Sequence, residues 1–192
     1  MIGTFLLSLG LSVTSANAAD ILPFLGFKAG PQFGIGTMSN SSKSTPSRSV
    51  NTLGLNALVG YKFPSNLLIG PSFEYRIVSQ PGSTGPDLKG NGYVGGVGMA
   101  FSFFPVPISI GANLDFLGKH SISQKVLGAD QSFSGVFGYR LLAGFSIFPA
   151  VSLDFIFSQH RYSDYKLGGT TLDISSDKLT HTSYGLGLAV QL

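Results

Sequence analysis

The 192-residue chain has no cysteine and no tryptophan, and only 11% of its residues are charged. The lack of cysteine excludes disulfides, thiolate zinc sites, cysteine nucleophiles and a lipidated N-terminal cysteine. The charged share is less than half of the roughly 25% found in soluble globular proteins. The 12 Lys and Arg residues form no basic cluster, so we expect no nucleic-acid partner. Apolar and small residues are abundant instead, with 43% hydrophobic residues and 26 glycines. This composition is typical of a membrane protein.

The N-terminus carries the pattern of an export signal. Residues 2–13 form a short apolar run, and Ala16-Asn17-Ala18 follows it with the small residues that signal peptidase accepts. The run is shorter than the roughly 20 apolar residues that a membrane-spanning helix needs. We therefore predict a signal peptide over residues 1–18, Sec-type export, and one mature domain over residues 19–192.

A second uncharged stretch, residues 90–114, resembles a transmembrane helix only by its hydropathy. It contains Gly92, Gly95, Gly96 and Gly98 and a Pro-Val-Pro sequence at 105–107. Its large apolar residues alternate instead of recurring every three or four positions, which is the period of a strand. The alternating set comprises Tyr93, Val97, Met99, Phe101 and Phe103. This stretch is therefore predicted to be a strand followed by a turn and a further strand.

The same two-residue period recurs along the mature chain and predicts eight strands. Besides the strand that ends at Phe103, the segments are 25–35, 52–63, 69–77, 108–116, 137–147, 151–160 and 183–192. Their minor face is mostly Gly, Ser, Ala and Asn, whereas a strand face in water would carry Lys, Glu and Thr. Small residues fit the inside of a narrow barrel, and the large apolar face fits lipid. Pro31 and Pro71 each remove a backbone donor, so we expect the strand pairing to break there.

The connections between these segments alternate in length. Short turns at 63–66, 104–107 and 148–150 alternate with polar connections over 39–50, 80–91, 121–132 and 163–178. Outer-membrane barrels have short periplasmic turns and longer extracellular loops. The 174 residues left after cleavage give about 22 per strand and link, which suits eight tilted strands. The predicted fold class is all-β, an eight-stranded antiparallel up-and-down transmembrane β-barrel.

With these features the chain resembles the small eight-stranded outer-membrane barrels of Gram-negative bacteria, the OmpA/OmpX/OmpW-like class. The resemblance covers the mature chain and includes an alternating last strand, Tyr184, Leu186, Leu188 and Val190, although Leu192 replaces the usual terminal aromatic residue. It implies an integral outer-membrane monomer that the barrel-assembly machinery inserts. Its surroundings would be outer-membrane lipid and lipopolysaccharide. Two aromatic girdles are expected, Phe63, Phe103, Phe104 and Phe148 at the turns and Tyr75, Tyr93, Tyr139 and Tyr184 toward the other rim.

Charged residues of the minor face are the candidate functional residues. Parity assigns to the lumen Lys28, Lys62, Glu74, Arg76, Asp115, Lys119, Arg140 and Asp154. We expect them to form ion pairs, because isolated charges in a narrow lumen are costly. A lumen plugged in this way predicts a non-enzymatic structural or surface-interaction role with polar extracellular loops. The many inward glycines leave room for the alternative, a narrow channel for small solutes.

A third hypothesis rests on His181 and Ser183, whose spacing resembles that in outer-membrane lipid A deacylases and phospholipases. Such an enzyme needs His to accept the Ser proton and a carboxylate, here Asp173 or Asp177, to orient the His. Parity turns the pair inward, away from lipid, so an acyl hydrolase is the least favoured hypothesis. The three His residues and scattered Asp residues show no metal-ligand spacing, so neither metal nor cofactor is predicted.

Overall fold

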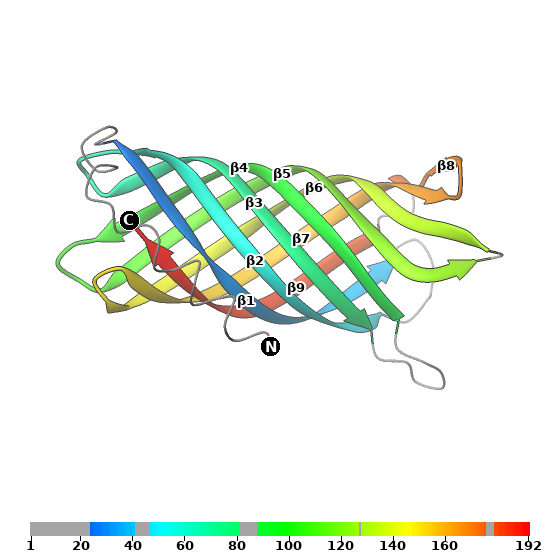
Figure 1. The fold of residues 1–192 in the computed structure, drawn as a ribbon, viewed down its shortest axis with the longest axis horizontal. Helices are drawn as coiled ribbons and strands as arrows, with labels where there is room; N and C mark the ends of the chain where they lie inside the picture. Colours follow the sequence, from blue (N-terminus) through cyan, green and yellow to red (C-terminus); the bar gives the residue numbers. More distant parts are fainter. Residues whose placement is uncertain (1–23, 41–46, 81–87, 127, 176–178) are drawn as a thin grey trace, which may run out of the picture.

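The computed structural model describes residues 24–40, 47–80, 88–126, 128–175 and 179–192, which form nine antiparallel strands (Figure 1). The predicted signal peptide, residues 1–18, lies outside the described residues. The strands are β1 Leu25–Asn40, β2 Arg48–Lys62, β3 Leu67–Gln80, β4 Leu88–Phe103, β5 Ile108–Val126, β6 Ala129–Phe148, β7 Val151–Leu167, β8 Thr170–Asp173 and β9 Leu179–Gln191.

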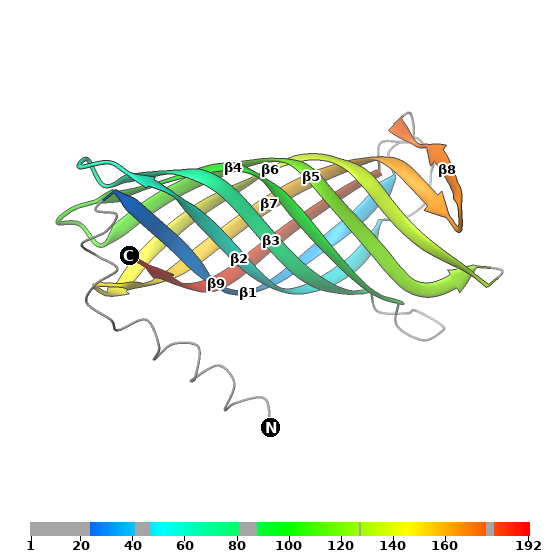
Figure 2. The ribbon, with the colours of Figure 1, turned by 45° about the horizontal axis from the view of Figure 1, so that its top comes forward.

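Eight of these strands close into a ring. Each strand from β1 to β7 pairs with the next, and β9 pairs with both β7 and β1. The short β8 pairs with the last four residues of β7 and stands beside the end of the ring (Figure 2). The predicted eight-stranded up-and-down barrel is therefore confirmed. Closure gives every ring strand a hydrogen-bonded neighbour on both sides, which a bilayer requires.

The three predicted tight turns and the C-terminus lie at one end of the barrel, here called the turn end (Figure 1). The β2–β3 turn closes through a 2.8 Å hydrogen bond from the Phe63 amide to the Leu67 carbonyl, with Asn66 at φ 63°. Residues 90–114 lie in β4, β5 and the turn between them, as predicted. No helix among the described residues is long and apolar enough to cross a membrane.

The opposite end, the loop end, differs from the prediction. Residues 121–132 were expected to form a long polar connection, but β5 continues to Val126 and β6 starts at Ala129, with Gly128 in the turn at φ 79°. Strand β7 likewise extends to Leu167. The prediction was wrong because polar side chains on both faces exclude only a strand buried in lipid. A hairpin in water satisfies its own backbone groups and tolerates them.

Side chains alternate between a lipid-type outside and a packed inside. Outward residues such as Leu53, Val97 and Phe137 are 57%, 50% and 62% exposed, and their strand neighbours on the other face are mostly buried. Predicted girdle residues lie outward as well, with Phe148 66% exposed near the turn end and Tyr184 62% exposed toward the loop end. An apolar belt of this extent is too large for a surface in water. It is the outer surface of a barrel that crosses a membrane.

Both prolines interrupt the backbone pairing, as predicted. The β1–β9 register passes directly from Ala29 to Gln32, omitting the pairs of Gly30 and Pro31. The β2–β3 register likewise passes from Ser72 to Ile69, omitting Pro71. A residue without a backbone N–H cannot donate to its neighbour strand, so the ladder opens locally.

A β-bulge in β5 reverses which side chains face the lumen beyond it. Asp115 and Leu117 pair with successive residues of β4, which leaves Phe116 as an extra residue. Phe116 and Leu117 are both outward, at 47% and 61% exposed. Beyond them Lys119 is exposed on the outside, and His120 is buried inside. The assignment of Lys119 to the lumen was wrong because the parity count did not include the extra residue.

Candidate functional site: the barrel lumen

The middle of the lumen is occupied by an ion pair between neighbouring strands. Arg140 of β6 donates from Nε and Nη2 to the two carboxylate oxygens of Asp115 on β5, each at 2.8 Å. Both side chains are at most 2% exposed. Gly138 lies opposite Asp115 in the register, and its missing side chain leaves room for His160 of β7. Two parallel hydrogen bonds of this kind fix both orientation and distance.

Arg76 of β3 extends the pair into a network. Its Nη2 donates to the Tyr162 hydroxyl at 2.7 Å, and its Nη1 lies 3.3 Å from His160 Nδ1. Arginine can only donate, so Nδ1 accepts, and the His160 proton belongs on Nε2, 2.9 Å from Asp115 Oδ2. Glu74 lies between the two guanidinium groups, 4.0 Å from Arg76 and 3.4 Å from Arg140.

A second ion pair lies apart from this network. Lys28 Nζ is 2.9 Å from both carboxylate oxygens of Asp154, which also accepts a 2.8 Å hydrogen bond from Ser152. Gly144 makes the space for the pair, because a Cβ there would collide with the Asp154 carboxylate and the Ser109 hydroxyl. The space at Gly144 and at Gly138, two of the inward glycines that suggested an open pore, is thus filled by side chains of the neighbouring strands.

The buried charges balance. Three cations, Lys28, Arg76 and Arg140, and three anions, Glu74, Asp115 and Asp154, are each no more than 5% exposed. Each cation has an anion within 4.0 Å. Burying charges costs several kcal/mol per ion unless partners and hydrogen bonds compensate, so this balance is what makes a charged interior tolerable.

Apolar side chains close the lumen on both sides of the network. Leu58, Leu68 and Ala100, at most 7% exposed, form one cluster toward the turn end. Val94 and Val136 pack with the Tyr162 ring in a second cluster, joined by Phe133 and Leu179. The charged network therefore lies between two clusters of buried apolar side chains.

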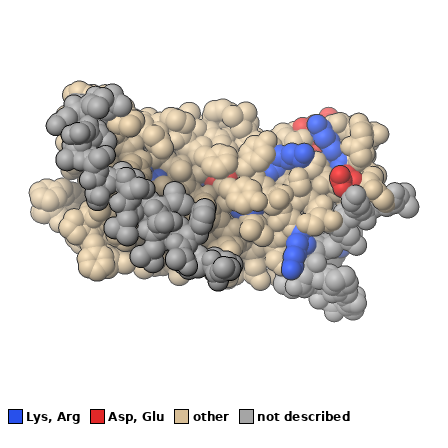
Figure 3. All heavy atoms as spheres, viewed as in Figure 1, with Lys and Arg blue, Asp and Glu red and all other residues tan. Residues whose placement is uncertain are grey.

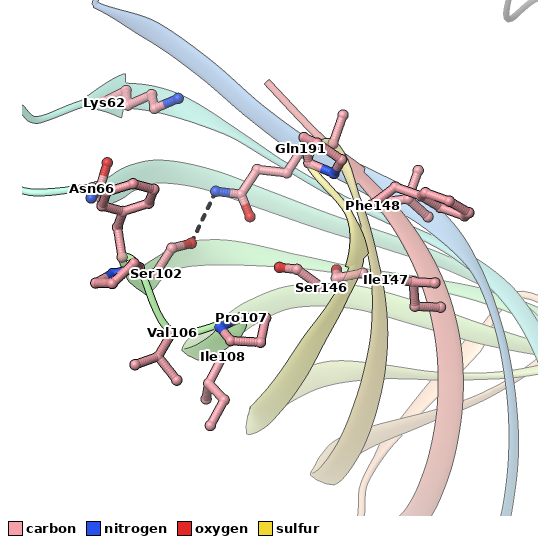
Figure 4. Close-up of a pocket in the computed structure, with 16 residues that line it drawn as sticks. Lys62, Asn66, Ser102, Val106, Pro107, Ile108, Ser146, Ile147, Phe148 and Gln191 are labelled. Atoms are coloured by element: carbon pink, nitrogen blue, oxygen red, sulfur yellow. Dashed lines mark hydrogen bonds between the residues drawn. The ribbon is translucent and has the colours of Figure 1, made fainter.

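Two cavities in the described part of the lumen differ in size and position. One beside Lys28, Asn113 and Arg140 has a volume of about 20 Å³, room for about one water molecule. A larger cavity of about 510 Å³ opens at the turn end (Figure 4). Its wall carries Lys62, and a 3.3 Å hydrogen bond from Gln191 to Ser102 crosses it.

The structure brings six of the eight predicted lumen charges together as buried pairs. Lys62 faces the cavity at the turn end, half-buried, with no ion pair to another described residue, and Lys119 lies outside. His160 and Tyr162 belong to the network but were not among the predicted lumen residues, although both share the inward parity of Asp154. His120, for which no face was predicted, is also buried in the lumen, because the bulge at residues 116–117 shifts the parity of β5.

The proposed hydrolase residues do not meet as a catalytic group. Ser183 Oγ lies 2.7 Å from Ser158 Oγ, and the Nε2 atom of His181, a residue 1% exposed, has no hydrogen-bond partner. Asp173 lies on β8, where it accepts a hydrogen bond from the Ser175 amide, and Asp177 lies outside the described residues. No group of three His, Asp or Glu side chains in the described part of the chain could hold a metal ion.

Several solved structures have the same architecture as this barrel. Neisserial surface protein A matches with a TM-score of 0.54 and 18% identity, over 85% of this chain and 96% of its own. The attachment invasion locus protein Ail of Yersinia pestis, in complex with the heparin analogue sucrose octasulfate, matches with a TM-score of 0.52 and 15% identity, over 88% of this chain and 99% of its own. The fold is that of the small outer-membrane β-barrels. No protein-family model and no curated protein sequence matches this barrel.

Proposed function

We propose that the protein is an integral outer-membrane barrel with a sealed lumen and no enzymatic activity, which serves a structural or surface-interaction role through its loop end. The observation that carries the proposal is the buried network around Arg140 and Asp115, enclosed by two apolar clusters. A barrel filled in this way is a rigid support for polar segments outside the membrane. The proposal includes a signal peptide over residues 1–18, a mature barrel from Ala19, and insertion by the barrel-assembly machinery.

A monomer is part of the proposal. The β6–β7 and β1–β9 pairings close the ring, so its eight strands present no open edge to a second copy within the membrane. Its surroundings are then outer-membrane lipid and lipopolysaccharide.

Cell fractionation tests the location. We expect the mature protein in the outer-membrane fraction, with N-terminal sequencing starting at Ala19. On a denaturing gel, unheated protein should migrate differently from boiled protein, because a closed barrel resists detergent unfolding. A soluble periplasmic protein without heat-dependent migration would overturn the proposal.

Planar-bilayer recording tests the sealed lumen. We expect no conductance steps from the reconstituted protein, with a large porin reconstituted in parallel as the positive control. The opposing result is steady ohmic steps that change when Glu74→Gln or Arg76→Gln alters the lumen charge.

The second candidate function is a narrow channel for small solutes, and the cavity at the turn end favours it. That cavity is large enough for several water molecules or a small solute. A solute would still have to pass Leu58, Leu68 and the ion pairs beyond, so the channel requires these layers to move. The same recording separates the two candidates.

An acyl hydrolase acting on lipid A or phospholipid is the least supported function, because Ser183 bonds to Ser158 inside the barrel instead of to His181. Lipid mass spectrometry of cells that express the protein or its Ser183→Ala variant tests it. We expect identical lipid profiles, and deacylated lipid that disappears with Ser183→Ala would establish the enzyme.

A further inference from the structure

The outside of the barrel carries a set of cations that the lumen network does not use. They are Arg48, Lys89, Lys119, Arg161 and Lys166, all exposed and all in the loop-end parts of their strands. In Figure 3 most of the visible blue atoms gather toward the loop end. The buried cations of the lumen each have an anion within 4.0 Å. The five outer cations make no ion pair with any other residue that the structure describes.

One of the outer cations, Lys119, lies within the tyrosine girdle, and another, Arg161, lies just beyond it. Lys119 pairs in the register with Tyr93, and Arg161 is two residues beyond Gln159, which pairs with Tyr139. Tyrosine side chains on a barrel mark the boundary between the apolar belt and the head groups of the lipid. The ammonium and guanidinium groups are therefore placed at the depth of the lipid head groups, on the face that the lipid covers.

The surface between these two cations carries the half-buried Ser134 and Asp164 and the exposed Phe137, which pairs with Arg161. Lys119 pairs with Ser134 of β6, and Ser134 pairs with Asp164 of β7, three residues from Arg161. This register places the Cα atoms of Lys119 and Arg161 about 14 Å apart, from the standard strand spacing and rise. Gly135 lies between them without a side chain, and the Ser163 hydroxyl covers it. The Ser163 hydroxyl donates to the Asp164 carboxylate at 2.9 Å.

We propose that Lys119 and Arg161 bind the phosphate groups of a phosphorylated glycolipid in the outer leaflet, the lipid A part of lipopolysaccharide. The inference rests on the proposed outer-membrane location. Arginine and lysine are the side chains that bind phosphate best, and two cations this far apart can hold two phosphates of one disaccharide head group. A soluble polyanion would reach the loops more easily than a lipid-covered strand face, which is why we assign the site to lipid.

The bulge at Phe116 is what creates the site. Without the extra residue, Lys119 would point into the lumen, and β5 would present His120 to the lipid head groups. The bulge therefore moves one positive charge from the lumen to the membrane surface.

The test compares the binding of two lipids by the purified full-length protein in detergent, by native mass spectrometry. The lipids are lipid A with both phosphates and the same lipid A after enzymatic dephosphorylation. We expect the wild-type protein to bind the phosphorylated lipid roughly tenfold or more tightly, from charge-assisted hydrogen bonds to two phosphates. The Lys119→Gln, Arg161→Gln double variant should lose this preference. Lys62→Gln, which removes a cation at the turn end, should keep it.

Heat-dependent gel migration of each variant shows that it is folded. Equal binding of both lipids by the wild type, or an unchanged preference in the double variant, would overturn the proposal. A heparin fragment is the third comparison. If it displaced lipid A from Lys119 and Arg161 and bound the lipid-free protein as tightly as lipid A does, the site would serve soluble polyanions and the proposal would be overturned. This comparison is made in detergent, so its outcome does not depend on where the protein lies in the cell. Cell fractionation tests the proposed outer-membrane location separately.

Discussion

Asp115 receives two hydrogen bonds from Arg140 and lies 2.9 Å from His160, so one carboxylate joins three neighbouring strands inside the barrel. The pair is fully enclosed, with Asp115 at 0% exposed. Removing one partner of such a pair leaves a buried charge without compensation, whereas removing both leaves only a packing defect. This relationship gives the first prediction.

Asp115→Asn should lower the free energy of unfolding by about 3–5 kcal/mol, because Arg140 loses its two charge-assisted hydrogen bonds and keeps only Glu74, 3.4 Å away, as an anionic partner. Urea unfolding in lipid vesicles, followed by heat-dependent gel migration, measures the change. The double variant Asp115→Asn, Arg140→Met should be less destabilised than the single variant. Asp173→Asn, on the exposed strand β8, serves as the control and should change little. A loss for Asp115→Asn no larger than that of the control contradicts the prediction.

Gly144→Val should destabilise the barrel by about 1–3 kcal/mol through overpacking. Its side chain would enter the space of the Asp154 carboxylate, within 3.4 Å of the Lys28 ammonium. The matched control is Gly169→Val between β7 and β8, where a Cβ meets nothing within 4 Å. The same urea titration compares the two variants, and equal stability would mean that the lumen adapts to the added volume.

Cysteine labelling should detect the bulge directly, because the chain has no cysteine of its own. A water-soluble maleimide added to whole cells should label Lys119→Cys, at the depth of the lipid head groups, faster than the enclosed His120→Cys. Uninterrupted alternation from Asp115 predicts the reverse order of labelling. Boiled protein provides the control, because both variants should react equally once the barrel is unfolded.

Leu68→Ala should cost about 2–5 kcal/mol, since Leu68 is 2% exposed and its truncation leaves a cavity in the cluster with Leu58 and Ala100. Leu188→Ala, on the lipid-facing side at 50% exposed, should cost less because lipid fills the space. If both variants unfolded at the same urea concentration, the inner cluster would contribute no more than the lipid-facing surface.

Much of the barrel could be read from the alternation of side chains. A strand in lipid must have one apolar face, so residues such as Leu53 and Val97 record their outward orientation in the sequence itself. The short turns could also be predicted from the sequence, because prolines follow Phe63 and Phe104. The loop end was harder to predict, because strands in water tolerate polar residues on both faces. Strands β5 and β6 therefore extend into 121–132, where a polar connection was expected.

The sequence by itself determined the closed barrel and the inward position of Arg140, Asp115 and Asp154, because period and parity are local properties of a strand. Only the tertiary structure decided which charges meet, as Asp115 pairs with Arg140 across β5 and β6 and Asp154 with Lys28 of β1. Partner choice depends on register and on the space left by Gly138 and Gly144. The tertiary structure also decided on which side of the barrel Lys119 lies. A single extra residue in β5 shifts the parity of the residues that follow, and its effect appears only when β5 is paired with β4.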